Sequence, residues 1–177
     1  MNATTSRTTS DAQQAEDSSR TASRGPNRAP RKVLAIASGG GHWVQLLRLM
    51  PAFEGHRVTF ITVNNSYRSD VAGHPFRVVN DATRWNKLAL LWSALRILAA
   101  IIVERPDVIV STGAAPGFMA IRLGKWLGAR TVWLDSIANV SELSLSGKKI
   151  GPHADLWLTQ WPHLARADGP QFRGSVL

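Results

Sequence analysis

The 177-residue sequence contains no cysteine, which excludes disulfide bonds and thiolate metal sites. Acidic residues are few: 12 Asp and Glu stand against 21 Lys and Arg, so the formal net charge is +9. This excess favours anionic partners such as nucleic acid, phosphorylated substrates or acidic lipids. Tyrosine occurs once, whereas tryptophan, a residue typical of surfaces that are apolar on one side and wet on the other, occurs seven times.

Apart from Met1, large apolar residues are absent from the first 31 positions, which contain no Val, Ile, Leu or Phe. Such a segment cannot bury enough surface to offset the entropy of ordering it. We therefore predict a disordered tail over residues 1–31 and one folded domain over residues 32–177. The tail also lacks the apolar run of a secretory signal or a membrane anchor.

Beyond the tail, short aliphatic runs alternate with helical patterns. Strands are expected at residues 33–37, 57–63, 76–79, 108–111, 131–134 and 156–159, and helices at 43–50, where Pro51 would end the helix, at 85–104, and after Gly117 as far as Leu127. Strands that alternate with helices form parallel βαβ units with right-handed crossovers. The predicted fold class is α/β, with a Rossmann-like doubly wound parallel sheet.

A glycine-rich loop follows the first predicted strand: Ser38, Gly39, Gly40 and Gly41 precede His42 at the start of a helix. In this fold class ligands bind at the carboxyl ends of strands, glycines allow close backbone approach, and a helix start attracts phosphate. The spacing matches neither a Walker loop nor a dinucleotide fingerprint. A plain strand-to-helix turn is the alternative interpretation.

His42 is the candidate catalytic residue, because a helix start favours neutral imidazole and a neutral histidine in the crevice can remove a proton from a hydroxyl group. A capping histidine is the alternative. A second glycine-bearing loop, residues 111–117, follows the fourth predicted strand. It either forms the other wall of the crevice or is an ordinary connection between a strand and a helix. The remaining histidines show no metal-ligand spacing, and no metal or cofactor is expected.

Residues 88–103 are apolar except for Ser93 and Arg96. This run is shorter than the ~20 residues that span a bilayer, and a charge near its middle is costly in hydrocarbon. Two interpretations stand: a core helix, or a helix partly inserted in a bilayer interface. Trp85 and Lys87 precede the run, as interfacial anchors often do.

Arg122, Lys125 and Trp126 share one face of the following predicted helix, because they lie three and four residues apart. Basic residues beside tryptophan suit an anionic membrane surface. A solvated helix face is the alternative.

The ordered set of motifs resembles one known family. It comprises Ser-Gly-Gly-Gly-His at 38–42, Ser-Thr-Gly-Ala at 111–114, Asp-Ser at 135–136, Leu-Ser-Leu-Ser-Gly-Lys at 143–148, Gln-Trp-Pro at 160–162 and Gly-Ser at 174–175. Over residues 32–177 this is similar to the asparagine-linked-glycosylation-fourteen-like family of polysaccharide biosynthesis subunits. The first loop is also similar to that of the peptidoglycan enzyme that adds N-acetylglucosamine to a lipid-linked muramyl peptide.

The resemblance implies the N-terminal half of a GT-B glycosyltransferase that is split into two chains and is inactive without its partner. This chain would bind a diphosphate lipid-linked acceptor at the cytoplasmic face of the membrane. The partner would bind the nucleotide sugar, with N-acetylglucosamine and glucuronate among the possible donors. The donor, the acceptor sugar, the lipid and the linkage stay open.

The resemblance also implies site residues. Those expected to line the crevice or bind the acceptor phosphates are Ser38, Gly39, Gly40, Gly41, His42, Ser111, Thr112, Gly113, Asp135 and Ser136. The sequence departs from the family at two of its positions: Asp135 replaces a Glu, and Asn139 stands where a basic residue is usual. Eukaryotic members also carry an N-terminal membrane helix, which residues 1–31 do not contain.

The C-terminal region is expected to bind the partner, because a fused GT-B chain would cross here into its second half. The residues expected at this seam are Trp161, Pro162, Phe172, Val176 and Leu177, and tryptophan is a frequent interface anchor. A frayed end that packs on its own domain is the alternative. Two other functions are weighed: a non-catalytic membrane recruiter, and a basic nucleic-acid-binding protein, for which no zinc, helix-turn-helix or RNA-reading signature is present.

Overall fold

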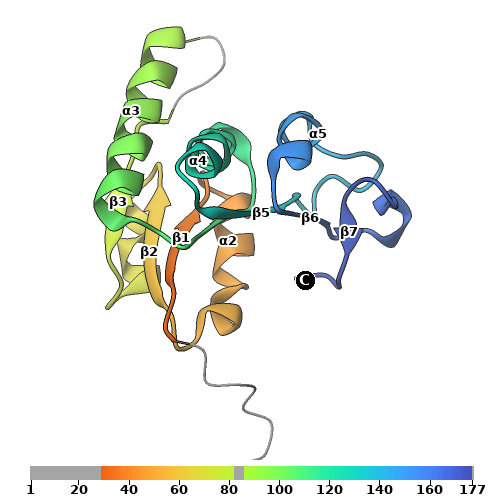
Figure 1. The fold of residues 1–177 in the computed structure, drawn as a ribbon, viewed down its shortest axis with the longest axis horizontal. Coiled ribbons are helices and arrows are strands. Elements are labelled where there is room, and N and C mark those ends of the chain that lie inside the picture. The colour runs from red at the N-terminus through yellow and green to blue at the C-terminus, as the bar shows by residue number, and fades with distance from the viewer. Residues whose placement is uncertain (1–28, 82–85, 177) are drawn as a thin grey trace, which may run out of the picture.

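A computed structural model describes residues 29–81 and 86–176, so residues 1–28 of the predicted tail lie outside the described residues. One all-parallel sheet has the strand order β3-β2-β1-β4-β5-β6-β7 (Figure 1). The strands are β1 (Lys32–Ile36), β2 (Arg57–Thr62), β3 (Phe76–Val78), β4 (Val108–Ser111), β5 (Arg130–Leu134), β6 (Leu156–Thr159) and β7 (Gln171–Phe172). This confirms the predicted α/β fold class, and each of the six predicted strands is present to within one residue at either end.

Helices cover both faces of the sheet. The α-helices are α2 (Gly41–Leu47), α3 (Lys87–Glu104), α4 (Ala114–Trp126) and α5 (Leu145–Ile150), and the 3₁₀ helices are η1 (Met50–Phe53), η2 (Asn65–Val71), η3 (Gly151–His153) and η4 (Pro162–Leu164). Alternate side chains of β1 enter two different cores, as the two-residue period of a strand requires. Leu34 and Ile36 pack with α3 and α4, whereas Val33 and Ala35 pack with α2 and η1 on the other face (Figure 1).

The predicted helix over residues 43–50 is wrong at its C-terminal end. The helix α2 ends at Leu47, and Pro51 lies inside η1 rather than after a longer helix. Proline is tolerated in the first turn of a helix, where its missing N–H would have no intrahelical partner, so it opens η1 here. The short elements η2, α5 and β7 were not expected, because each is too short to show a periodic pattern.

The apolar helix α3 is buried on a narrow side only. Asn86 caps its start by accepting a hydrogen bond from the N–H of Ala89 at 3.0 Å. Its buried residues are Ser93, Ile97, Ala100 and Ile101. The opposite side is apolar and open, with Leu88 80% exposed and Val103 67% exposed, and its first turns extend past the sheet (Figure 1). The core interpretation therefore holds for one side of α3. The other side has no cover within the described residues, and its insertion in a bilayer interface stays a prediction.

Asp155 joins three elements beyond the core. Its Oδ2 accepts hydrogen bonds from the backbone N–H and the hydroxyl of Thr131 in β5, at 2.9 and 3.0 Å, and its Oδ1 pairs with the ammonium of Lys125 in α4. The hydrogen bond from Lys125 holds the pKa of this carboxyl below its usual range; Thr131 adds to this effect and partial burial opposes it. Asp155 is therefore the ionic link between α4 and the β5–β6 pair.

We predict that Asp155→Asn lowers the free energy of unfolding at pH 7 by about 1–2 kcal/mol, because hydrogen bonds to a charged carboxylate are lost. Since the folded-state pKa is depressed, the contribution is present above the unfolded value of about 3.9 and is lost as pH falls through the folded value. Urea unfolding at pH 7 and at pH 3 measures both effects. Asp168→Asn, at an exposed carboxylate, is the control. Equal stability of the two variants at pH 7 would contradict the assigned link.

Candidate functional site

The two glycine loops meet where the neighbouring strands β1 and β4 end. The imidazole Nδ1 of His42 lies 2.8 Å from the carbonyl oxygen of Thr112, and the Thr112 hydroxyl donates a hydrogen bond of 2.7 Å to the carbonyl of His42. A carbonyl oxygen only accepts, so Nδ1 carries a proton in this contact. In the neutral imidazole the free lone pair is then on Nε2. The pair of hydrogen bonds holds the histidine against the second loop.

Gly113 leaves the space that the histidine ring occupies. Its φ of 138° lies in a region that other residues rarely adopt, and a Cβ at this position would overlap the His42 ring. The next residue, Ala114, also has a positive φ, 63°, as α4 begins. The turn from β4 into α4 is therefore shaped around the imidazole.

An open cleft of about 610 Å³ lies between these loops. It is lined by Ser38, Gly39 and His42 from the first loop, by Ala114, Ala115 and Pro116 at the start of α4, and by Val63, Asn64 and Asp81. It lies at the carboxyl ends of the parallel strands, where ligands bind in this class of fold. The first turns of α2 and α4 adjoin it, and first turns carry N–H groups without intrahelical partners.

Two of the residues expected to line the crevice are buried behind the residues that do line it. Ser111 and Thr112 are both fully buried. The Ser111 hydroxyl accepts a hydrogen bond of 3.2 Å from the N–H of Gly113, and the Thr112 hydroxyl is bound to His42. They shape the second loop instead of presenting their side chains to the cleft, because both belong to the strand end and the tight turn that carries the histidine contact.

Three residues near the cleft were missed by sequence reasoning. The hydroxyl of Tyr67 accepts a hydrogen bond of 3.0 Å from the N–H of Gly40, and its ring stacks on Trp43 at 5.1 Å. Asn64 and Asp81 line the cleft. The available signal was position: Asn64 and Asp81 follow the second and third strands, whose carboxyl ends reach the same edge of the sheet.

Asp135 is turned inward and is only 2% exposed. Its carboxylate accepts hydrogen bonds from the backbone N–H groups of Ser136 (2.9 Å) and Ser144 (3.1 Å) and from the side-chain amide of Asn139 (3.1 Å). The two departures from the family pattern therefore contact each other. Ser136 is also buried, and its hydroxyl accepts a hydrogen bond from Ala138. These contacts order the loop after β5.

The residues expected to contact the membrane differ in exposure and in ion pairing. Lys87, Arg122 and Trp126 are exposed, and Trp126 is 78% exposed. Lys125 is exposed but is paired with Asp155. Trp85 lies outside the described residues. No helix of the described residues is both long and apolar enough to cross a bilayer.

Two of the residues expected at the partner seam, Trp161 and Val176, form hydrogen bonds within this chain. Trp161 donates a hydrogen bond of 3.0 Å from its ring to the carbonyl of Ile137. Val176 is docked by its backbone: its N–H donates to Gln160 and its carbonyl accepts from Arg48, at 3.0 and 2.9 Å. Pro162 and Phe172 are exposed, and Leu177 lies outside the described residues. Phe172 belongs to β7, the last strand of the sheet.

Comparison with known folds extends these observations. The chain superposes on the crystal structure of MurG from Acinetobacter baumannii with a TM-score of 0.68 and 14% identity, over 81% of this chain and 45% of that one. The sheet is therefore that of one half of a GT-B glycosyltransferase. The chain spans less than half the length of the MurG chain.

Comparison of sequences gives the family. A family model described as "Oligosaccharide biosynthesis protein Alg14 like" matches residues 71–176. A protein of Yarrowia lipolytica named "UDP-N-acetylglucosamine transferase subunit ALG14" is 37% identical over 79% of this chain and 78% of its own length. The protein of the same name from Eremothecium gossypii is 28% identical over 81% and 77%. This chain belongs to the Alg14-like family of oligosaccharide biosynthesis proteins.

Proposed function

We propose that this chain is the acceptor-binding subunit of a two-chain glycosyltransferase, which transfers a sugar from a nucleotide-sugar donor to a diphosphate lipid-linked acceptor. The observation that carries the proposal is His42, held at the cleft between two glycine loops by the Thr112 carbonyl. The relatives named as UDP-N-acetylglucosamine transferase subunits make UDP-N-acetylglucosamine the first donor to test.

The chemistry follows from the hydrogen bond at Nδ1. Because Nδ1 donates to Thr112, the lone pair of Nε2 is available as a general base. It would take the proton from the acceptor hydroxyl as this oxygen attacks the anomeric carbon of the donor sugar. The nucleotide diphosphate leaves as the sugar–oxygen bond to it breaks, and the partner would hold this leaving group. The N–H groups of the first turns of α2 and α4 suit the phosphates of the acceptor.

The need for a partner is supported by the names of the relatives. The Eremothecium gossypii and Yarrowia lipolytica proteins, which this chain covers to 77% and 78% of their lengths, are both named as subunits. The second half, with the nucleotide-sugar site, would come from another polypeptide. The exposed Phe172 and Pro162 and the edge strand β7 form the proposed contact with it.

We also propose that the chain acts at the cytoplasmic face of a membrane. The uncovered side of α3 carries Leu88, Leu91, Trp92, Leu95, Ile102 and Val103, all about half exposed or more. Lys87 begins α3, and Arg122 is exposed on the neighbouring helix α4. An apolar helix face accompanied by basic residues is typical of helices that lie in a bilayer interface. A lipid-linked acceptor would reach the cleft from such a surface. A recruiter without catalysis shares this surface and differs only in the role of His42.

His42→Gln is expected to lower the turnover of the reconstituted two-chain enzyme by about 10²–10⁴-fold, because the general base is lost. Sugar transfer from UDP-N-acetylglucosamine to a lipid diphosphate acceptor measures this, with partner binding measured in parallel. His153→Gln, at an exposed histidine far along the chain in η3, is the control. A turnover within threefold of the wild type would assign His42 to a capping role and favour the recruiter.

Replacing Leu91 and Trp92 together by Gln is expected to weaken binding to lipid vesicles more than tenfold, because two apolar side chains no longer enter the interface. Both are exposed, so thermal stability should change little. The matched control replaces Val44 and Val140, which are also about half exposed but lie outside α3. Vesicle sedimentation provides the measurement, and equal losses in the two double variants would remove α3 from the membrane contact.

Removal of residues 172–177 is expected to abolish co-purification with the partner subunit while the α/β core stays folded by circular dichroism. Since the deletion also removes the contacts of Val176 with Gln160 and Arg48, Phe172→Ser tests the exposed side chain alone. Leu145→Ser, at another exposed apolar residue, is the control. Full recovery of the partner by both the truncated chain and Phe172→Ser would place the seam elsewhere.

A further inference from the structure

The amino ends of the parallel strands form the side of the sheet opposite the cleft, here called the amino edge, and this side is strongly basic. The strands β1, β2 and β5 each begin with a basic residue, namely Lys32, Arg57 and Arg130. Arg31 precedes β1, and Arg105 lies at the end of α3, two positions before Asp107. The carboxyl edge, in contrast, has the neutral glycine loops. These five basic residues are therefore gathered at the side of the sheet away from the proposed catalytic cleft.

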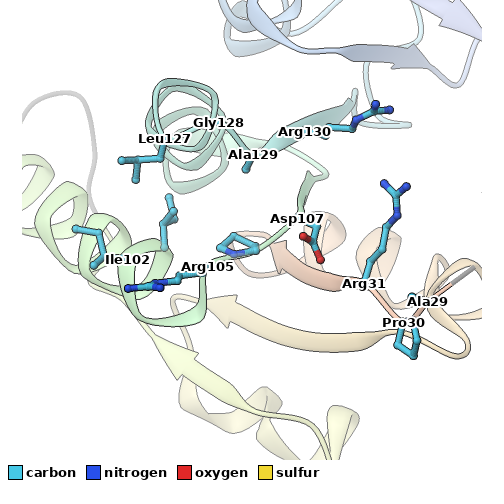
Figure 2. Close-up of a pocket in the computed structure, with 12 residues that line it drawn as sticks. Ala29, Pro30, Arg31, Ile102, Arg105, Asp107, Leu127, Gly128, Ala129 and Arg130 are labelled. Atoms are coloured by element: carbon cyan, nitrogen blue, oxygen red, sulfur yellow. The ribbon is translucent and has the colours of Figure 1, made fainter.

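A groove of about 1120 Å³ runs along this edge, between the strand starts and the C-terminal ends of α3 and α4 (Figure 2). Its cationic side chains are Arg31, Arg105 and Arg130, and Asp107 is the single carboxylate among its lining residues. One oxygen of Asp107 accepts a hydrogen bond of 2.8 Å from the backbone N–H of Lys32. Within the described residues none of these three arginines forms an ion pair. Figure 2 shows Arg31 and Arg130 on one side of Asp107 and Arg105 on the other.

The far wall of the groove is apolar and open to solvent. Ile102 and Leu127 line it, and their neighbours Val103 and Trp126 are more exposed still. Ile102 and Val103 end the uncovered side of α3. The groove thus lies where an unpaired cluster of arginines meets the proposed membrane-binding face.

Simple complementation of helix dipoles does not account for the cluster. Cations at the C-terminal ends of α3 and α4 would be favourable, and Arg105 and Arg130 follow those helices. Arg31, however, precedes β1 and follows no helix within the described residues, yet it lines the same groove. Nor does a nucleic-acid site fit, because the wall opposite the arginines is aliphatic rather than polar.

We propose that this groove seats the phosphate headgroup of an anionic phospholipid, with Ile102 and Leu127 at the acyl boundary. Arginine binds phosphate through two parallel N–H donors, which suits a headgroup held between guanidinium groups. The proposal rests on the proposed membrane association and adds a choice of lipid to it. Because α3 runs from the cleft edge to the amino edge, a helix lying flat on the bilayer brings both edges to its surface.

The test measures binding of the full chain to vesicles of phosphatidylcholine alone and to vesicles with phosphatidylserine added. Arg105→Gln combined with Arg130→Gln is expected to weaken binding to the anionic vesicles by about tenfold or more, since each near-surface arginine contributes about 1 kcal/mol. Binding to the neutral vesicles should change by less than about twofold. The charge-matched control is Lys149→Gln combined with Arg166→Gln, at exposed positions on the C-terminal side.

The outcomes separate this proposal from the membrane contact on which it rests. Equal losses in the two double variants on anionic vesicles would overturn the groove while leaving the α3 contact intact. A wild-type chain that binds neither kind of vesicle would overturn the membrane contact and the groove together. Saturable, arginine-dependent binding of glycerol 3-phosphate without preference for anionic vesicles would identify a soluble anion as the occupant. A more than tenfold gain in vesicle binding after removal of residues 1–28 would identify the tail as the occupant instead.

Discussion

The backbone carbonyl of Asp135 connects three segments of the domain on the side of the sheet where the cleft opens. Two buried glutamines donate to it: Gln45 from α2 at 3.1 Å and Gln160 from the end of β6 at 3.2 Å. The other amide oxygens are used as well, since Gln45 accepts from Ile137 and Gln160 from Val176. A buried polar network is stabilising only when its members are satisfied. The helix α2, which carries His42, the loop after β5 and the C-terminal segment are therefore linked through this carbonyl oxygen.

This coupling connects the candidate site to the C-terminal segment, where the proposed partner would bind. His42 lies on the helix that Gln45 anchors, and Val176 lies beside the proposed partner seam that Gln160 anchors. Two hydrogen bonds connect Val176 in the C-terminal segment to the Asp135 carbonyl through Gln160. A third, from Gln45, connects that carbonyl to α2.

The two edges of the sheet have different chemistry, and α3 connects them. The carboxyl edge has glycine loops and a histidine; the amino edge has arginines and an aliphatic wall. In a parallel sheet every strand runs in one direction, so residues at strand starts gather at one edge and residues after strand ends at the other. The strand direction is therefore what brings the basic residues at the starts of β1, β2 and β5 to the same side of the sheet.

Local patterns in the sequence predicted six strands, the parallel α/β class and the glycine loops, because aliphatic runs, helical periods and glycine clusters depend on neighbouring residues alone. They did not predict that Pro51 lies in the first turn of a 3₁₀ helix or that β7 exists. The contact between His42 and Thr112 joins residues 70 positions apart, and it exists because β1 and β4 are adjacent in the sheet. The same strand order turns Ser111 and Asp135 inward and brings Arg31, Arg105 and Arg130 to one groove. The sequence by itself therefore determined the six longer strands, the two long helices and the candidate histidine. Only the tertiary structure decided which side chains face the cleft, the core or the solvent, since that depends on which strands become neighbours.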